Sequence, residues 1–146
     1  MQGSRIGLIG LGAAGTGIAL VLAENGYSLL VSDVRPASTF DALLREGSGK
    51  LTFVANPAEL CSQCSVVLTS LPSVAVIASV AENIIIPNLR GTWIDTSTTD
   101  EEEVQRLGPL CKTNGIDLLE APLTGGVHLV RSGDSALHVA LASCRQ

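Results

Sequence analysis

The chain has 146 residues, of which 46% are hydrophobic, and its 9 Lys and Arg against 14 Asp and Glu give a formal net charge of −5. This length suits one domain with a single hydrophobic core, and we expect residues 1–146 to form it. The acidic balance, without a cluster of Lys and Arg, excludes the basic surface that is typical of nucleic-acid binding.

The first predicted elements surround a glycine-rich corner. The apolar run over residues 6–9 predicts a buried strand, and the pattern over residues 13–25 predicts a helix. Where the strand gives way to the helix, Gly10, Gly12 and Gly15 form the spacing G-x-G-x-x-G. In a strand–turn–helix context, these glycines allow a tight turn, the approach of a pyrophosphate to the backbone, and close packing of helix on strand.

The same stretch has no charged residue over positions 6–23, so a membrane span and a signal peptide are alternative interpretations. A spanning helix needs about 20 apolar residues, whereas this run is shorter and is weakened by repeated glycines. It begins almost at Met1 and leads into further patterned sequence instead of a cleavage site. We therefore expect no membrane partner and a cytoplasmic location, with the mitochondrial matrix as the alternative.

Strand and helix patterns alternate along the rest of the chain. The expected strands cover residues 5–9, 28–32, 51–55, 65–70, 92–95, 116–120 and 135–142, and the expected helices lie near 13–25, 37–46, 57–62, 73–82 and 99–113. This alternation predicts an α/β fold: a Rossmann-like, doubly wound, mostly parallel sheet with helices on both faces. The last strand follows the previous one without a long helix, which is compatible with an antiparallel strand at one edge.

An acidic residue follows the second expected strand. Asp33 lies 18 positions after Gly15, close to the spacing at which a carboxylate accepts hydrogen bonds from the ribose hydroxyls of a dinucleotide. The carboxylate favours NAD over NADP. Two alternatives remain open at this point: an ordinary loop aspartate, and an S-adenosylmethionine-dependent methyltransferase, which also joins a glycine-rich corner to an acidic residue after the second strand.

The four cysteines are expected to be reduced thiols. Cys61 and Cys64 form a C-x-x-C motif, but a structural zinc site needs a second pair, and Cys111 and Cys144 lie far apart in the sequence. We expect these cysteines to serve packing, with redox chemistry as the alternative, and we expect no metal site.

Five segments, "GLIGLGAAGTGIA", "SDV", "TSLP", "WIDTSTTD" and "EAPLTGG", occur in an order and spacing that resemble the cofactor domain of the β-hydroxyacid dehydrogenases. This family includes 3-hydroxyisobutyrate dehydrogenase, tartronate semialdehyde reductase and 6-phosphogluconate dehydrogenase. The resemblance covers the whole chain. It implies an NAD(P)-binding domain of an enzyme that transfers a hydride between the nicotinamide and a small β-hydroxyacid or its semialdehyde.

The resemblance also implies roles for individual residues. Leu71 and Pro72 would lie over the cofactor, Thr98 beside the nicotinamide, and Thr124, Gly125 and Gly126 at the substrate carboxylate. The full set implied for cofactor binding is Gly10, Leu11, Gly12, Ala13, Ala14, Gly15, Asp33, Val34, Arg35, Leu71, Pro72 and Thr98. Judged from the residues alone, Thr98 or Thr99 is also a helix N-cap before an acidic first turn, and the two glycines also suit a simple turn.

Several positions depart from the family pattern. Ala14 stands where the family usually has Met, and Leu129 and Val130 stand where it tends to have small residues. Among the nearby polar residues, His128 and Arg131 are candidates for substrate contact. We expect His138, inside an apolar strand, to be structural.

No catalytic residue is assigned in this chain. The family's general acid is a lysine on a helix of a second, all-helical domain, and neither Lys50 nor Lys112 has that sequence context. We expect the chain to be the cofactor half of such an enzyme, either a fragment or a truncated product, and not catalytically competent by itself. The alternative is a non-catalytic NAD(H)-binding module, and a longer form would be expected to form homo-oligomers.

Overall fold

The computed structural model describes residues 5–124, 136–137 and 140–141. The strands are β1 (Ile6–Ile9), β2 (Leu29–Ser32), β3 (Leu51–Phe53), β4 (Val66–Thr69), β5 (Gly91–Asp95), β6 (Ile116–Glu120), β7 (Leu123–Thr124), β8 (Ala136–Leu137) and β9 (Ala140–Leu141). The helices are α1 (Ala13–Glu24), η1 (Ala37–Phe40), α2 (Asp41–Glu46), α3 (Pro57–Gln63), α4 (Val74–Val80), η2 (Ala81–Ile85), α5 (Ile86–Asn88) and α6 (Glu101–Thr113).

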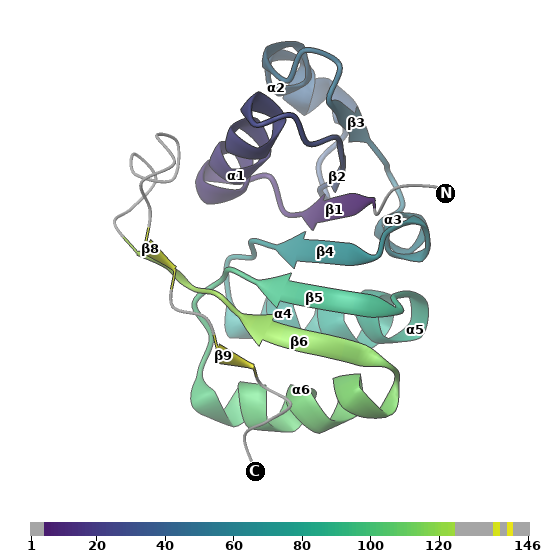
Figure 1. Ribbon diagram of the computed structural model, residues 1–146, viewed down its shortest axis with the longest axis vertical. Coiled ribbons are helices and arrows are strands. Elements are labelled where there is room, and N and C mark those ends of the chain that lie inside the picture. The colour runs from purple at the N-terminus through teal and green to yellow at the C-terminus, as the bar shows by residue number, and fades with distance from the viewer. Residues whose placement is uncertain (1–4, 125–135, 138–139, 142–146) are drawn as a thin grey trace.

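The central sheet has the strand order β3-β2-β1-β4-β5-β6-β9 (Figure 1). The pairs from β3 to β6 are all parallel, and β9 is antiparallel to β6 at the edge. The strand order therefore reverses between β1 and β4, because the chain builds outward first on one side of β1 and then on the other. In doubly wound sheets, ligands bind outside the carboxyl ends of the strands at this switch point.

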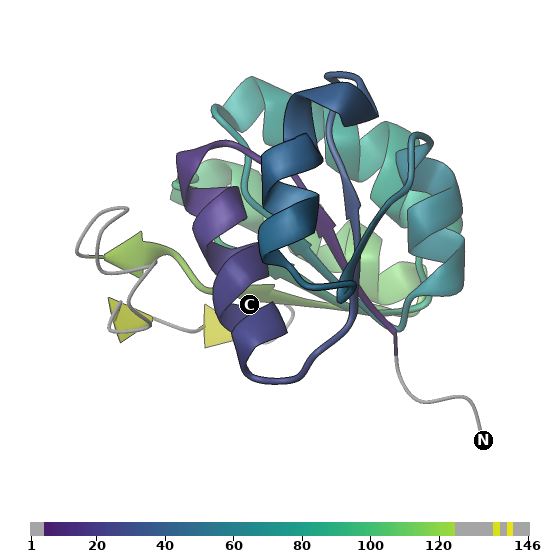
Figure 2. The same cartoon turned by 90° about the horizontal axis from the view of Figure 1, so that it is seen from above.

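Strand side chains alternate between two hydrophobic cores on opposite faces of the sheet. On β1, Leu8 packs into the core formed with α1 and α2, and the next residue, Ile9, packs into the core formed with α3, α4 and α6. Figure 2 shows α1 and α3 on opposite sides of the strands. This period-two alternation of buried residues on both faces is what a parallel sheet covered by helices requires, and the expected fold class is confirmed.

Near its carboxyl end the chain differs from the expected strand over residues 135–142. Within the described residues, this stretch contributes two short strands: β8 pairs with β7 in a separate two-stranded sheet, and β9 pairs with β6. The prediction of one continuous strand was therefore wrong, although an antiparallel strand does lie at the sheet edge. His138 lies outside the described residues.

Two helices also differ from their predicted limits. The helix that begins at Val74 continues through the π-helical turn η2 and α5 to Asn88, beyond the predicted end near residue 82, and Pro87 lies in its last turn. Helix α6 begins after Asp100, whose carboxylate accepts from the Glu103 amide at 2.8 Å. The N-cap is thus Asp100, and the N-cap role expected of Thr98 or Thr99 was wrong.

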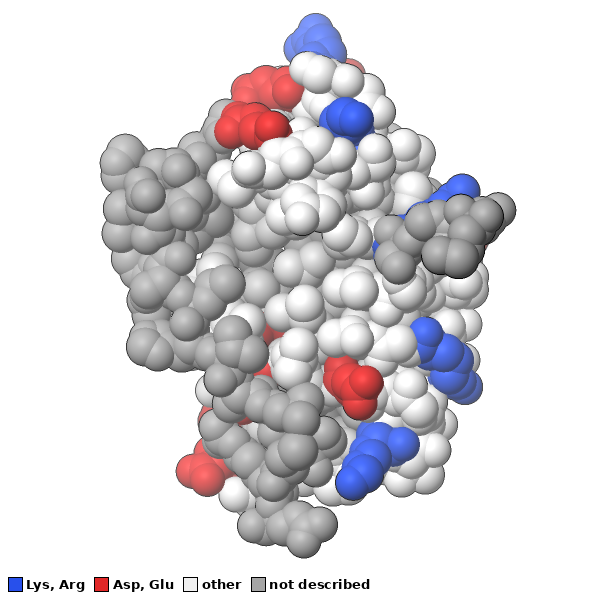
Figure 3. Space-filling view, viewed as in Figure 1, with Lys and Arg blue, Asp and Glu red and all other residues white. Residues whose placement is uncertain are grey.

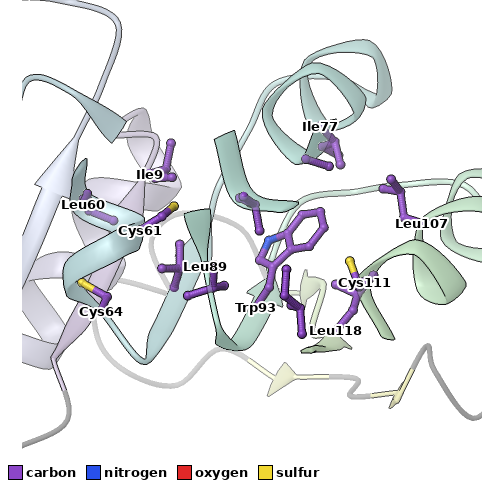
Figure 4. Close-up of a cluster of buried hydrophobic side chains, with 14 of the residues drawn as sticks. Ile9, Leu60, Cys61, Cys64, Ile77, Leu89, Trp93, Leu107, Cys111 and Leu118 are labelled. Carbon is purple, nitrogen blue, oxygen red and sulfur yellow. The ribbon is translucent and has the colours of Figure 1, made fainter. Parts of the chain in front are cut away.

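Three of the four cysteines contribute to one hydrophobic core. Cys61, Cys64 and Cys111 are free and buried in the same core as Trp93, which is fully buried on β5 (Figure 4). Burial raises the pKa of Cys61 to about 12 and that of Cys111 to about 11, which keeps these thiols protonated and unreactive at neutral pH. Their role in packing is therefore confirmed for these three, while Cys144 lies outside the described residues.

Charged side chains are sparse on the face of the molecule drawn in Figure 3, where the Lys and Arg residues of the described chain stand apart from one another. Within the described ranges, no helix combines the length and the apolar composition that crossing a membrane requires.

Candidate functional site

A groove of about 820 Å³ lies over the carboxyl ends of β1, β2 and β4. Its walls come from the glycine corner, the segment after β2, the connection from β3 to α3, the end of β4, and the helix formed by α4 and η2. The lining residues are Ile9, Gly10, Gly12, Ala13, Ala14, Ser32, Asp33, Val34, Arg35, Ala55, Pro57, Ser70, Leu71, Pro72, Val76, Val80 and Ile84.

The three glycines of the corner have different environments. Gly10 has a φ of 102°, and a Cβ there would collide with the carbonyl oxygen of Ser70. At Gly15, a Cβ would collide with the carbonyl oxygen of Gly10, so this glycine lets α1 pack closely on the corner. At Gly12, by contrast, a Cβ would meet no atom within 4 Å. The first and third glycines therefore serve the fold, while the space at the second is open to a ligand.

Gly12 is also the N-cap of α1, and no side chain caps this helix end. The first turn of α1 contains no acidic residue. The amide groups of a helix N-terminus and the helix dipole together favour an anion. The corner therefore presents an uncapped, positively polarised helix end to the groove.

Asp33 lies at the rim of the groove and is held by four hydrogen bonds from two residues, Leu11 and Arg35. Its Oδ2 accepts from the Leu11 amide at 2.8 Å, and its Oδ1 accepts from the Arg35 amide at 3.0 Å. The Arg35 guanidinium adds two further hydrogen bonds, from Nε to Oδ1 and from Nη2 to Oδ2. The Asp33 side chain is 8% exposed, whereas that of Arg35 is 50% exposed.

These contacts determine the charge state of Asp33. Burial alone raises the pKa of this carboxyl group, but the hydrogen bonds from Arg35 and Leu11 outweigh burial and lower the pKa from 3.8 to about 2. Asp33 is therefore ionised at neutral pH and acts only as an acceptor. Leu11 is buried and contributes through its backbone.

At the other end of the groove, a buried carboxylate connects the ends of β4 and β5. Asp95 Oδ1 accepts from the Thr69 hydroxyl at 2.9 Å and from the Ser97 amide at 3.1 Å. The Ser97 hydroxyl in turn accepts from the Leu71 amide at 2.8 Å, and Trp93 Nε1 donates to the Thr69 hydroxyl at 2.9 Å. Burial raises the pKa of Asp95, and the hydrogen bonds from Ser97 and Thr69 oppose that rise.

Within the described part of the chain, a few buried hydroxyls have no hydrogen-bond partner. The Oγ of Ser32, a residue that lines the groove, is one of them, and the Oγ1 of Thr99 is another. A buried polar atom without a partner is costly. The Ser32 hydroxyl can therefore serve a polar ligand or a water molecule bound in the groove.

The structure brings most of the predicted cofactor residues to this groove. Gly15 and Leu11 support the corner without lining it in the described chain, and Thr98 is exposed on the loop before α6, also outside the described lining. Thr124 lies on β7, and Gly125 and Gly126 lie outside the described residues, as do His128 and Arg131.

Sequence reasoning missed the apolar wall formed by Val76, Val80 and Ile84. These residues recur every fourth position on one face of the α4–η2 helix. That spacing was visible in the sequence, but such a stripe normally indicates a face buried against the core. Only the tertiary structure shows that part of the stripe faces a groove.

The chain is similar to several known proteins. The family described as the NAD-binding domain of 6-phosphogluconate dehydrogenase matches residues 5–141. Human mitochondrial 3-hydroxyisobutyrate dehydrogenase is 31% identical over 133 residues, which cover 88% of this chain and 38% of the dehydrogenase. The cytokine-like nuclear factor N-PAC of Pongo abelii is 29% identical over 154 residues, which cover 97% of this chain and 27% of N-PAC.

The fold is also found among solved structures. The structure of Psf3 in complex with NADP+ and 2-OPP superposes with a TM-score of 0.82 and 22% sequence identity, covering 92% of this chain and 48% of Psf3. This likeness shows the fold. The chain thus spans well under half the length of the two curated relatives named above, with 27% of N-PAC and 38% of the human dehydrogenase.

Proposed function

This chain belongs to the family of the NAD-binding domain of 6-phosphogluconate dehydrogenase, and from that membership we propose that its groove binds the NAD(H) of an oxidoreductase acting on a small β-hydroxyacid or its semialdehyde. The observation that carries the proposal is the open space at Gly12 in the same groove as the ionised Asp33. A dinucleotide places its pyrophosphate at the second glycine and its adenosine ribose at the acidic residue.

The residues of the groove fit such a ligand. The uncapped amino end of α1 would hold the pyrophosphate through backbone amides near Ala13 and Ala14. Asp33 would accept hydrogen bonds from the ribose hydroxyls, and Val34, which is fully exposed beside it, would cover the adenine. Leu71 and Pro72 would form the wall on the β4 side.

We expect NAD(H) to be preferred over NADP(H). An ionised Asp33 would repel a 2′-phosphate, and a pair of like charges at about 4 Å interacts unfavourably by about 4 kcal/mol at an effective dielectric of 20. Arg35 reduces this repulsion because its guanidinium lies on the same carboxylate. Psf3, which shares the fold, is described with NADP+, so the fold by itself does not choose between the two cofactors.

This chain would orient the cofactor and supply part of the substrate site. When bound, NAD(H) supplies or accepts the hydride. Thr124, with Gly125 and Gly126, would donate hydrogen bonds to the substrate carboxylate, since two glycines let the backbone approach a bound anion closely. The general acid would come from outside the described groove, whose lining contains neither Lys50 nor Lys112.

Titration of the purified chain separates this proposal from the methyltransferase alternative. NADH binding is followed by calorimetry, and S-adenosylmethionine is titrated in parallel. We expect saturable binding of NADH and none of S-adenosylmethionine. Binding of S-adenosylmethionine without NADH would overturn the proposal.

A second candidate is a domain that binds NAD(H) without chemistry. It is favoured by one observation: a stretch covering 97% of this chain aligns with a protein named as a nuclear factor and not as a dehydrogenase. Supplying a separate helical domain of a family dehydrogenase, together with NAD+ and 3-hydroxyisobutyrate, distinguishes the two. NADH formation supports the oxidoreductase, and binding without turnover supports the binding module.

A further inference from the structure

The buried carboxylate of Asp95 stands out because it lies next to the groove without lining it. Asp95 is 3% exposed, and the hydrogen bonds that reach it come from the Thr69 hydroxyl and the Ser97 amide. Donors converging on a buried carboxylate form a rigid network, provided that each is satisfied. Here the donors sit on two different segments, at the end of β4 and just after β5.

Each of these segments is attached to the other by further hydrogen bonds. Thr69 and Asp95 are paired in the parallel register of β4 and β5, and the Thr96 hydroxyl and amide both donate to the Thr69 carbonyl. The Ser97 amide donates to Asp95, and the Ser97 hydroxyl accepts from the amide of Leu71. Through Ser97, the Asp95 carboxylate therefore fixes the position of the Leu71 amide in the groove wall. Leu71 and Ser97 are 26 positions apart in the sequence.

We propose that Asp95 is a positioning residue which, acting through Ser97, holds Leu71 and thereby shapes the half of the groove that receives the nicotinamide side of the cofactor. The inference rests on the proposed NAD(H) function. Asp33 defines the adenosine end beside β2, and the pyrophosphate corner lies between β1 and α1. The remaining half of a dinucleotide must then extend toward β4 and β5, where Leu71 stands.

The hydrogen-bonded carboxyl group of Asp95 is suited to this role for a physical reason. Asp95 accepts from the Ser97 amide, which fixes the backbone of Ser97 and so the place at which the Ser97 oxygen accepts from the Leu71 amide. Asparagine at position 95 keeps one acceptor oxygen but turns an NH2 donor toward neighbouring donors. The change has nearly the same volume, so it alters the direction of the network more than the packing.

The test compares two ligands that share the adenosine half of the cofactor. Affinities for NADH and for ADP-ribose, which lacks the nicotinamide, are measured by calorimetry for the wild type, Asp95→Asn, Ser97→Ala and the double variant. We expect each single variant to weaken NADH binding by about tenfold, while ADP-ribose binding stays within about twofold. Because both residues act on Leu71 as a unit, the double variant should bind NADH no more weakly than the single variant with the lower NADH affinity.

A matched control uses a serine outside the network whose hydroxyl oxygen is buried. Ser65 stands at the opposite, amino-terminal end of β4, and its buried Oγ has no partner within the described chain. Ser65→Ala should leave both affinities unchanged. The chain's single tryptophan, Trp93, donates to Thr69 in the same network, so its emission reports whether Asp95→Asn has altered the network in a protein that is still folded.

Three outcomes would overturn the inference: equal losses for NADH and ADP-ribose, no loss for NADH in a folded Ser97→Ala protein, or losses that add in the double variant. Equal losses would mean that Asp95 supports the fold as a whole. Failure of the proposed function is recognised separately, because the wild type would then bind neither ligand.

Discussion

The Arg35 side chain encloses the carboxylate of Asp33, with Nε 2.9 Å from Oδ1 and Nη2 3.2 Å from Oδ2. The guanidinium also lies 5.0 Å from the centroid of the Phe40 ring and donates to the Leu11 carbonyl. The acidic residue that a ribose would contact is therefore already paired with a cation. A ribose hydroxyl would have to replace at least one of these hydrogen bonds, so both residues take part in choosing the cofactor.

The first prediction concerns this choice. In the wild type, NADH should bind at least about tenfold tighter than NADPH, because the ionised Asp33 repels a 2′-phosphate. Arg35→Ala should raise the ratio further, since it removes the cation that partly offsets the repulsion. Calorimetry with both cofactors measures the ratio, and Arg45→Ala, an exposed arginine on α2 outside the groove lining, is the control. Equal affinities in the wild type would refute the role given to Asp33.

The second prediction separates binding from folding at the glycine corner. Gly12→Val places a side chain in open space, so the protein should fold with a wild-type circular dichroism spectrum but lose NADH binding. Gly15→Ala, by contrast, should destabilise the fold, because its Cβ meets the Gly10 carbonyl oxygen. Urea unfolding measures the second effect. A folded Gly12→Val protein with unchanged NADH affinity would show that the corner does not bind the pyrophosphate.

The third prediction is that residues 1–146 bind NADH but do not oxidise 3-hydroxyisobutyrate or glycerate. Hydride transfer to a carbonyl builds negative charge on its oxygen, and without a positioned acid the step loses a factor of about 10²–10⁴. A substrate site open to water on one side adds a further loss of orientation. Absorbance at the NADH band follows the reaction. Robust turnover by this chain would mean that a residue to which no acid role is assigned above, with Lys112 and His128 first, acts as the acid.

The fourth prediction concerns stability in acid. Because hydrogen bonds lower the folded pKa of Asp33 from 3.8 to about 2, its contribution to stability is present above about pH 4 and is lost as the pH falls toward about 2. Asp95 acts in the opposite direction, since burial raises its folded pKa, so its contribution favours folding at low pH and declines as the pH rises.

Asp33→Asn isolates the first of these effects. The urea midpoint should fall less between about pH 6 and about pH 3 in this variant than in the wild type, because the amide does not titrate. Asp41→Asn, an exposed residue at the start of α2, is the control and should behave like the wild type. If the urea midpoint of Asp33→Asn fell between the two pH values by as much as that of the wild type, the assignment of the low pKa to Asp33 would be contradicted.

Much of the fold was determined by local sequence patterns. The alternation of apolar strand and helix segments was sufficient to predict the parallel sheet, and the first six strands were placed to within two residues at each end. The glycine spacing and Asp33 likewise located one end of the groove, because both depend on short stretches of chain. Local patterns failed at Thr98 and Thr99, where several adjacent residues were equally suitable caps and the backbone selected Asp100.

The tertiary structure alone decided which distant residues meet. The pairing of Arg35 with Asp33 depends on a side-chain direction that spacing does not specify. The connection from Asp95 through Ser97 to Leu71 depends on the register of β4 against β5, which brings together residues 26 positions apart. Local propensity acts over a few residues, whereas register is set by burial on both faces of the sheet. For that reason the sequence located the groove, and only the folded chain showed what holds its walls.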